Sequence, residues 1–460
     1  MQKKTKVIIL IFLIALIIRI IFVFSTPIKW WDEAVYADLG YDLSKNPLHY
    51  SFDGKWSDFV PAGDWPKAGF RAPLLPYFLS IFYLLKLDFL VEFLIPFIGA
   101  LSVVLVYLLG EKMFNEKIAF YSSIFLALVP IHVYYSGRIL TDVLSTFLIL
   151  LSIYSFWKGF EEGEKKYKVL FGFFLALSIL ARYTSLWVAP VFLFYFLIKK
   201  KSLSFLKDKY LWLSILIFFI VLSPWFLYSN SEYKNPIGAF IHGAKAASYW
   251  GGVQPWYFFF QYSWNMFSII TIIFLFSLLY LLYKKDFIKK EIYFLLILIV
   301  FFFLMASLMP HKEDRFLLPI TPAICLISGF FIEKIRYHKL VFSFLVIFLL
   351  ISLFLSFNYT YKNSYTESNL CFLKANEFLK NTQDGLVVTD SSPIVYYYSK
   401  KETFYYPNPW TPDSAQNPAY KYFLLSDYDM SPKYLNIKND LDSNLEEVFN
   451  CSNTIVYKNL

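Results

Sequence analysis

The chain has 460 residues, of which 58% are hydrophobic and 22% aromatic, a composition typical of integral membrane proteins that excludes a secreted soluble domain. In a soluble protein its net charge of +9 would suggest nucleic-acid binding. Here the lysines cluster in short connections between apolar segments, so they indicate membrane topology, and no nucleic-acid partner is expected.

The first apolar segment, residues 7–24, is long enough to cross a bilayer. Lys3, Lys4 and Lys6 precede it and favour a cytoplasmic N-terminus. Because the segment lacks a small-residue cleavage site, we expect it to remain in the protein as an anchor. Arg19 lies inside this segment. It is expected either to pair with an anion near the outer leaflet or, as the favoured alternative, to extend its side chain outward to water.

Further apolar segments follow, separated by short polar connections. Together with the first they predict about eleven transmembrane helices, near residues 6–24, 89–110, 118–135, 140–158, 167–182, 185–199, 210–228, 263–283, 291–309, 315–333 and 339–357. Segment 72–87 is also apolar, but it is short and has prolines near its start. Placing it in the membrane interface keeps lysine-rich connections such as 199–209 and 284–290 on the cytoplasmic side. We therefore expect a multi-pass α-helical protein of the cell membrane.

The composition changes from about residue 359 onward. Short β-rich runs alternate there with polar stretches and proline-rich turns, at residues 385–389, 420–425 and 454–457. We therefore expect a transmembrane domain over 1–358 and a small extracytoplasmic α/β domain over 359–460. Cys371 and Cys451 lie in this second domain and could form a disulfide, which their spacing alone leaves open.

Two long connections are expected on the extracytoplasmic side, residues 25–72 and 229–262, and both mix aromatic and polar residues as interfacial helices do. The first holds Trp31, Asp32 and Glu33, where the first helix must emerge into water. Asp32 is a candidate general base that deprotonates an acceptor hydroxyl. The alternative is an acid that caps the start of an interfacial helix. The acid pair alone leaves both interpretations open.

Arg138 and Asp142 lie one helical turn apart at the outer mouth of the predicted helix 140–158. A salt bridge between positions i and i+4 is the alternative to a functional role, and it contributes only a few tenths of a kcal/mol. That alternative remains a competitor for Arg138. For Asp142, a second acid at the membrane depth of Asp32 favours a shared polar pocket.

The third polar cluster is the stretch 311–315, which contains only ionisable residues and lies between two apolar segments. A solvated hairpin tip is the alternative, but it explains poorly why His311 and Arg315 flank the group at helical spacing. Arg315 is suited to hold a phosphate bidentately, and His311 could donate to the same group. Arg71 and Arg182 are further cationic candidates near the outer ends of apolar segments.

Several of these segments resemble membrane glycosyltransferases of the GT-C fold. The resemblance is to the group of protein O-mannosyltransferases, aminoarabinose transferases and rhizobial lipopolysaccharide transferases, glycosyltransferase family 39. The matching segments are Trp31-Asp32-Glu33-Ala34-Val35-Tyr36, Arg71-Ala72-Pro73-Leu74, Arg138 to Asp142, Ala181-Arg182-Tyr183-Thr184 and Gln254-Pro255-Trp256-Tyr257. The stretch 311–319 is similar to a motif of lipid-linked mannosyltransferases. The resemblance covers roughly residues 6–357. One departure is Ala72, where members of the family often have the first of two prolines.

The resemblance implies an enzyme of the cell envelope that transfers a sugar, with inversion, from a polyprenyl- or dolichyl-phosphate donor. The acceptor would be a hydroxyl of a protein, lipid or glycan on the extracytoplasmic side. Asp32 would be the catalytic base, while Glu33 and Asp142 would shape the pocket for acceptor and donor. The donor phosphate would meet Arg71, Arg182 and Arg315. His311 and Arg138, selected from their positions in the sequence, are further candidates for contact with this phosphate. Acceptor or interface contacts would come from aromatic residues, namely Trp31, Tyr36, Trp256 and Tyr257.

A lipid phosphate is already a good leaving group, so no cofactor is required for such a transfer. A divalent ion held by Asp32, Glu33 and Asp142 is the less favoured alternative. A transporter or flippase of lipid-linked sugars is the competing function. Transporters usually place ionisable residues near the bilayer midplane, whereas here these residues gather at the outer mouth, which favours an enzyme. A non-catalytic scaffold is a further alternative, and it predicts no effect of removing the Asp32 carboxylate.

Overall fold

The computed structural model describes residues 2–50, 69–200, 203–249, 252–407, 410–429 and 434–459. The chain forms two compact units. We call residues 1–23, 70–75 and 92–357 the bundle unit, and residues 24–69, 76–91 and 358–460 the sheet unit.

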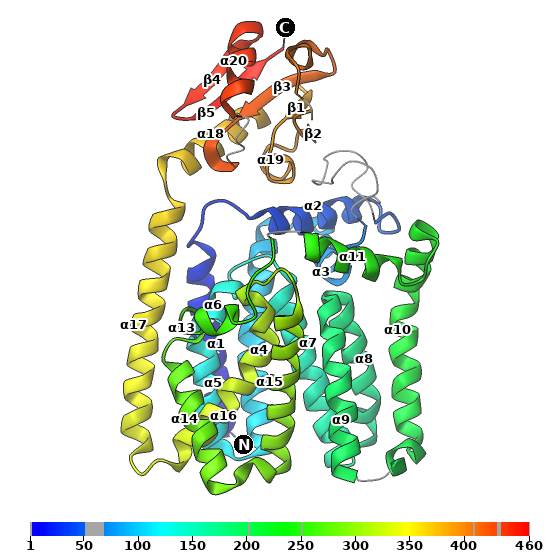
Figure 1. Cartoon of the computed structure of the whole chain (residues 1–460), viewed down its shortest axis with the longest axis vertical. Helices are drawn as coiled ribbons and strands as arrows, with labels where there is room; N and C mark the ends of the chain where they lie inside the picture. Colours follow the sequence, from blue (N-terminus) through cyan, green and yellow to red (C-terminus); the bar gives the residue numbers. More distant parts are fainter. Residues whose placement is uncertain are drawn as a thin grey trace. The chain divides into compact units, whose positions relative to one another are not determined.

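The bundle unit consists of apolar helices that run side by side (Figure 1). Its helices are α1 (Gln2–Val23), α4 (Leu94–Met113), α5 (Glu116–Leu128), α6 (Pro130–Ser136), α7 (Thr141–Phe156), α8 (Lys165–Ala181), α9 (Val188–Lys200), α10 (Lys209–Tyr233), α11 (Gly238–Tyr249), α12 (Phe258–Gln261), α13 (Ser263–Phe267), α14 (Ile269–Lys284), α15 (Lys290–Leu308), α16 (Thr321–Lys334) and most of α17 (His338–Ser364). Short helical turns join them, namely η1 (Asp88–Phe93), η2 (Trp157–Glu161), η3 (Tyr183–Trp187), η4 (Leu203–Lys207), η5 (Asp286–Ile288) and η6 (Asp314–Ile320). α4 packs against α1, α5 and α7, and α8 packs between α7 and α10.

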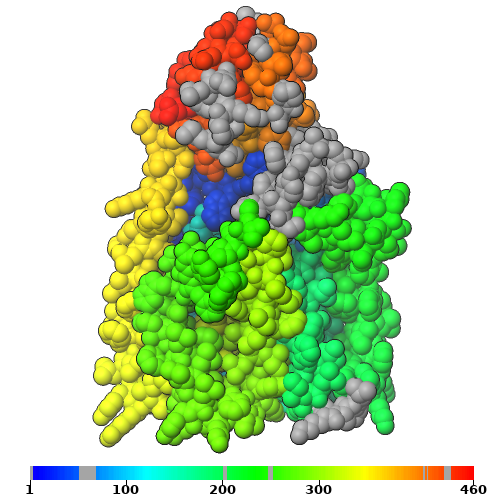
Figure 2. All heavy atoms as spheres, viewed as in Figure 1, coloured from blue at the N-terminus to red at the C-terminus, as the bar shows by residue number. Residues whose placement is uncertain are grey.

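Among the described residues, seven helical segments are long and apolar enough to cross a membrane, and the bent pair α5–α6 makes an eighth if it is counted as one span. Figure 2 shows the outward surfaces of α10, α14 and α17, and exposed large apolar side chains lie on these helices, such as Phe219, Leu279 and Phe354. These surfaces suit contact with lipid. The prediction of a multi-pass α-helical membrane protein is confirmed.

Helices lie over all eleven segments expected to span the membrane, but α8, α9 and α14 have only 17, 13 and 16 residues. The count of eleven spans therefore remains a prediction. α3 (Leu74–Leu84) covers the segment expected in the interface. Its 11 residues correspond to roughly 16 Å, which is too short for a hydrocarbon core of about 30 Å.

The bend between α5 and α6 explains the position of Arg19. The two helices meet at 58°, and Pro130 has no N–H to donate to the Leu126 carbonyl. Arg19 is fully buried and donates to the carbonyl oxygens of Leu126 at 3.1 Å and Ala127 at 3.3 Å. The favoured prediction that Arg19 extends outward to water is therefore wrong. Its guanidinium satisfies backbone carbonyls that the broken helix leaves without donors.

The sheet unit contains a five-stranded sheet in the order β2-β1-β3-β5-β4. Its strands are β1 (Leu386–Val388), β2 (Thr403–Phe404), β3 (Tyr420–Leu425), β4 (Glu446–Cys451) and β5 (Thr454–Lys458). β1 pairs in parallel with β2 and β3, whereas β5 pairs antiparallel with β3 and β4. The expected small α/β region is therefore confirmed near the C-terminus.

Alternate residues of the strands face two cores, as the twofold period of a strand requires. Val387, Leu424 and Val456 lie in one buried cluster, together with residues of α18 (Glu367–Lys380), α19 (Ser392–Ser399) and α2 (Trp31–Lys45). Phe423 and Ile455 lie in the other cluster, with residues of α20 (Tyr434–Asn444). The short turns η7 (Pro412–Gln416) and η8 (Asp427–Asp429) complete the unit.

A disulfide joins Cys371 in α18 to Cys451 at the end of β4, with 5.4 Å between the Cα atoms. It fastens α18, on one face of the sheet, to an edge strand. The pairing that the sequence left open is thereby present. Cys325 in α16 is a free and fully buried thiol.

Candidate functional site

An ion-pair cluster lies where α7 begins. The Asp142 side chain is in the first turn of this helix and is only 2% exposed. Its Oδ1 lies 2.9 Å from Nη1 of Arg182, and its Oδ2 lies 3.9 Å from Nη1 of Arg315. Arg182 directly follows α8, and Arg315 belongs to η6. Three helical segments therefore bring one buried acid and two cations together, and these partners offset the cost of burying the carboxylate.

Glu313 balances the charge of Arg315. Its Oε2 lies 2.6 Å from the Arg315 Nε, and its Oε1 accepts from Nη2 at 2.8 Å, a two-point contact. The His311 Nε2 lies 3.1 Å from the same Oε1. Burial raises the pKa of Glu313, but the charge of Arg315 and the hydrogen bonds from Arg315 and His311 together lower it below its ordinary value. The Glu313 carboxylate is therefore ionised at neutral pH.

The turn that carries Glu313 and Arg315 is also tied to α6. The Tyr135 hydroxyl donates to the Asp314 Oδ1 at 2.5 Å, and the same oxygen accepts from the Arg315 N–H at 2.9 Å. Arg138 lies in the connection from α6 to α7, is 3% exposed, and donates to the Tyr134 hydroxyl at 3.3 Å. These side chains are largely buried, so the turn is not a solvated hairpin tip.

Tyr183 connects the segment of Arg71 to the same region. Its hydroxyl donates to the Phe70 carbonyl at 2.8 Å and accepts from the Trp225 indole at 3.0 Å. Arg71 follows Phe70 directly, and its guanidinium lies over the Phe70 ring, 5.5 Å from the centroid. Because Tyr183 also follows Arg182 in the chain, the segments of these two predicted phosphate ligands are held close together.

The second long connection is fastened to the turn 311–315. The Lys312 N–H donates to the Gln254 Oε1 at 2.6 Å, and its Nζ donates to the carbonyls of Gln254 at 2.9 Å and Met309 at 2.6 Å. The Lys312 charge thus satisfies backbone carbonyls in a site that is 4% exposed. Trp256 and Tyr257 follow Gln254 and are 69% and 49% exposed. They remain candidates for acceptor or interface contacts.

The predicted acid pair begins α2, in the sheet unit. Asp32 lies half-buried in the first turn. The Glu33 side chain is fully buried, and its Oε2 accepts from the Trp30 N–H at 2.9 Å. Glu33 therefore caps the start of the helix, which is the alternative that the sequence left open for this pair. Its contact fixes the helical turn from which the Asp32 side chain projects.

Two aromatic candidates lie on the same helix. The Trp31 ring stacks on Tyr405, with 5.8 Å between centroids and 18° between planes. Tyr36 is half-buried about one turn further along α2. Their contact with an acceptor remains a prediction.

Two further acids on α2 were missed by the sequence reasoning. Asp38 is fully buried and Asp42 is 5% exposed. Lys400 Nζ lies 3.9 Å from the Asp38 Oδ1. Burial raises the pKa of Asp38 well above its ordinary value; Lys400 opposes this rise, and Asp42 adds to it. Their spacing of four residues on an otherwise apolar helix face is the signal that could have located them.

Within the described residues, no group of three or more His, Cys, Asp or Glu side chains is placed to hold a metal ion. His242 and His338, which lie on α11 and α17, are likewise not assembled with other metal ligands there.

Comparisons with known proteins agree with this architecture. Residues 70–228 match the family of dolichyl-phosphate-mannose-protein mannosyltransferases. A curated relative, dolichyl-phosphooligosaccharide-protein glycotransferase 2 of Pyrococcus horikoshii, is 29% identical over 275 residues, which are 55% of this chain and 34% of the relative. The chain thus spans about a third of the length of that relative.

Solved structures show the same fold. ArnT from Cupriavidus metallidurans, bound to undecaprenyl phosphate, superposes with a TM-score of 0.77 at 12% identity and covers 98% of both chains. The oligosaccharyltransferase AglB from Archaeoglobus fulgidus, in complex with an inhibitory peptide and a dolichol-phosphate, gives a TM-score of 0.65 at 13% identity, over 91% of this chain and 69% of that one. The resemblance seen in the sequence is therefore confirmed, and the chain has the GT-C fold.

Proposed function

We propose that this membrane protein is a glycosyltransferase that moves a sugar from a polyprenyl- or dolichyl-phosphate donor to an acceptor hydroxyl. The observation that carries the proposal is the partly buried cluster of Asp142, Arg182, Arg315 and Glu313 at one end of the bundle unit. The ArnT structure with undecaprenyl phosphate and the AglB structure with a dolichol-phosphate and a peptide support a lipid-phosphate donor. The acceptor is a protein, lipid or glycan.

The donor phosphate is proposed to bind at this cluster. Asp142 and Glu313 together carry two negative charges, which balance those of Arg182 and Arg315. A guanidinium pairs with a phosphate in the same two-point geometry as with a carboxylate, so the phosphate can compete with one of the acids for its arginine. The cations then stabilise the charge that develops on the leaving phosphate. His311, Arg138 and Arg71 are the remaining predicted phosphate-side residues.

Asp32 is proposed as the general base. It takes the proton of the acceptor hydroxyl while the acceptor oxygen forms a bond to the anomeric carbon. The bond from that carbon to the phosphate oxygen breaks, so that the lipid phosphate leaves and the anomeric centre inverts. Asp142 and Glu33 shape the site, and Glu33 does so by capping α2. Contacts with the acceptor or the membrane interface come from aromatic residues, namely Trp31, Tyr36, Trp256 and Tyr257.

This mechanism requires no cofactor because the donor carries its own leaving group. A divalent ion remains the alternative. We further propose a cytoplasmic N-terminus and an extracytoplasmic sheet unit, because lysines gather in the connections on the side of the N-terminus. The sugar transfer would then take place on the extracytoplasmic side of the cell membrane.

The test uses full-length protein purified in detergent, with a panel of undecaprenyl- and dolichyl-phosphate sugars and solubilised cell-envelope acceptors. Release of lipid phosphate coupled to acceptor glycosylation is measured. We expect Asp32→Asn to lower transfer at least about 100-fold, since a positioned base contributes roughly 10²–10⁴ in rate. The matched control is Asp38→Asn, on the same helix, which should retain transfer. Full activity of Asp32→Asn would refute the base. A flippase would show no sugar transfer in detergent, where there is no membrane to cross.

A further inference from the structure

A cavity of about 410 Å³ lies in the bundle unit, at the opposite end from the ion-pair cluster. Its walls come from α1, α4, α5 and α17. α5 begins at this cavity and, through α6, leads to Arg138 near the cluster, so one membrane span separates the two places. The cavity also lies at the end where α1 begins, since Val7 lines it.

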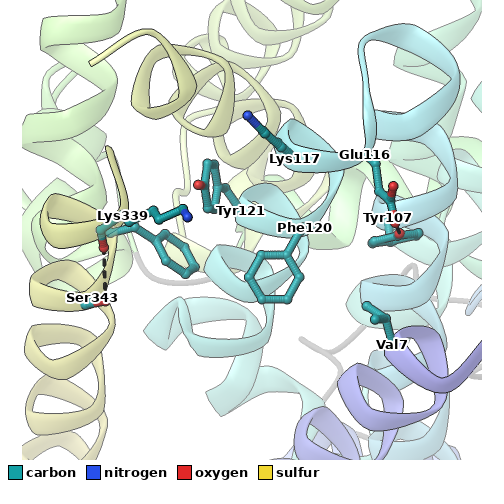
Figure 3. A pocket seen from close by; sticks show the side chains of 9 residues that line it. Val7, Tyr107, Glu116, Lys117, Phe120, Tyr121, Lys339 and Ser343 are labelled. Atoms are coloured by element: carbon teal, nitrogen blue, oxygen red, sulfur yellow. Dashed lines mark hydrogen bonds between the residues drawn. The ribbon is translucent and has the colours of Figure 1, made fainter. Parts of the chain in front are cut away.

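The lining is amphipathic. Apolar and aromatic side chains make up most of the wall, among them Val7, Phe120 and Phe342, while Lys117 and Lys339 add two ammonium groups. Figure 3 shows the two lysine side chains on either side of the Tyr121 ring. The volume lies within the range of about 300–1,000 Å³ that is common for small-molecule pockets.

The charges of the two lysines are available to a ligand. Other lysines near this end of the bundle unit form ion pairs within the protein: Lys4 pairs with Glu111 at 2.6 Å, and Lys112 pairs with Glu162 at 3.3 Å. In the part of the chain that the structure describes, no ion pair involves Lys117 or Lys339.

One acid faces the same cavity. Glu116 lines it and accepts a hydrogen bond from the Tyr107 hydroxyl at 3.4 Å. Two ammonium groups against one carboxylate leave the lining with a net positive charge. A ligand that fits both the charge and the apolar wall must join an anionic group to a hydrocarbon chain.

We propose that this cavity binds a membrane lipid with a phosphate headgroup. The phosphate would lie beside the Tyr121 ring, within reach of Lys117 and Lys339, and the first methylene groups would contact Phe120, Phe342 and Val7. Basic pockets between transmembrane helices on the cytoplasmic side of a membrane bind anionic headgroups, and this is the side that we propose for the N-terminus. The proposal is independent of the sugar-transfer reaction, because it concerns the other end of the bundle.

The experiment is native mass spectrometry of the full-length protein in detergent, with added phosphatidylglycerol, undecaprenyl phosphate or the zwitterionic phosphatidylcholine. We expect one tightly retained molecule of phosphatidylglycerol and no retained phosphatidylcholine. Undecaprenyl phosphate can also occupy the proposed donor site, so if it fits the cavity we expect two retained molecules, of which the Lys117/Lys339 variant keeps one. The first two lipids distinguish a membrane phospholipid from an isoprenoid phosphate as the natural source. A lysine near a lipid phosphate contributes about fivefold in affinity, so Lys117→Gln with Lys339→Gln should weaken retention roughly thirtyfold.

The matched control is Lys284→Gln with Lys285→Gln, which removes the same number of positive charges. These two lysines lie at the same end of the bundle unit as the cavity, because α15 starts shortly after them and ends at the other side, just before the turn 311–315. The control variant should retain the lipid. Ser343→Phe fills the cavity without changing its charge and should also abolish retention. Equal retention of phosphatidylglycerol by the Lys117/Lys339 variant and the control, or retention of phosphatidylcholine equal to that of phosphatidylglycerol, would overturn the proposal.

Discussion

The pair of Asp142 and Arg182 offers the sharpest test of the ion-pair cluster. Asp142→Asn removes the negative charge of a side chain that is 2% exposed. Arg182 and Arg315, which are 19% and 12% exposed, then each lose one anionic partner. Breaking a fully buried pair costs about 3–5 kcal/mol. Arg315 keeps Glu313 and Arg182 keeps a partial exposure to solvent, so we expect a loss near 2–3 kcal/mol in the free energy of unfolding.

The assay uses the free thiol of Cys325. This side chain is fully buried in α16, and the other two cysteines form a disulfide, so a thiol-reactive fluorescent dye reports unfolding of the bundle unit. With about 2–4 °C per kcal/mol for domains of moderate size, Asp142→Asn should lower Tm by roughly 4–12 °C. Arg182→Gln should lower Tm by a similar amount.

The double variant decides whether the two residues act on each other. If they form the pair seen in the structure, the loss in Asp142→Asn with Arg182→Gln should be about 1–2 kcal/mol smaller than the sum of the single losses. Strict additivity of the two Tm shifts would refute the reasoning, because it would mean that the 2.9 Å contact carries no coupling. Arg182→Lys is the control, since it retains the charge and should recover part of the stability.

Three further outcomes are expected. Arg315→Ala should raise the KM for the lipid-phosphate donor at least about tenfold more than the KM for the acceptor, because a charge-assisted contact is worth roughly 1.5–3 kcal/mol; equal effects on both would count against a donor-side role. Asp38→Asn should raise Tm at neutral pH, because burial raises the pKa of this carboxyl and so opposes folding of a chain in which it is ionised. The advantage should shrink as the pH falls below the raised pKa and vanish only near pH 4, about the ordinary pKa of an aspartate, where the unfolded chain is protonated as well; a constant difference at all pH values would contradict this. Cys371→Ser with Cys451→Ser removes a disulfide that joins residues 80 positions apart, and it should destabilise the sheet unit by about 4 kcal/mol. Faster proteolysis of that unit is the expected measurement, and an unchanged rate would show that the disulfide is dispensable.

Much of the architecture follows from local patterns. Apolar segments longer than a bilayer is thick predict helices wherever they occur, and helices lie over every expected segment. The β-rich runs at 420–425 and 454–457 correspond to β3 and β5, because a short run of aromatic and β-branched residues that is buried on both faces can be recognised locally. β4 begins with Glu446 and Glu447 and lies at the sheet edge, where charged residues are tolerated, so its sequence does not read as a strand.

The site was only partly predictable because its partners are distant in sequence. Asp142, Arg182 and Arg315 could each be selected as costly charges near the ends of apolar helices. Their mutual contacts join α7, the end of α8 and η6, which no spacing rule relates. Asp38 was missed because it lies inside an amphipathic helix, where a polar residue is ordinarily assigned to the solvent face.

The partners of a buried charge indicate which charges serve the fold and which can serve a ligand. Arg19, Glu33 and Lys312 bond to backbone groups, so each one supports a bend, a helix start or a connection. Asp142, Arg182, Arg315 and Glu313 pair with one another, and the four charges cancel. An anionic ligand that competes for Arg315 can displace Glu313, which is 29% exposed, whereas displacing Asp142, 2% exposed, would leave a buried charge unpaired. For this reason the cluster supports a phosphate site more strongly than any single arginine in the chain does.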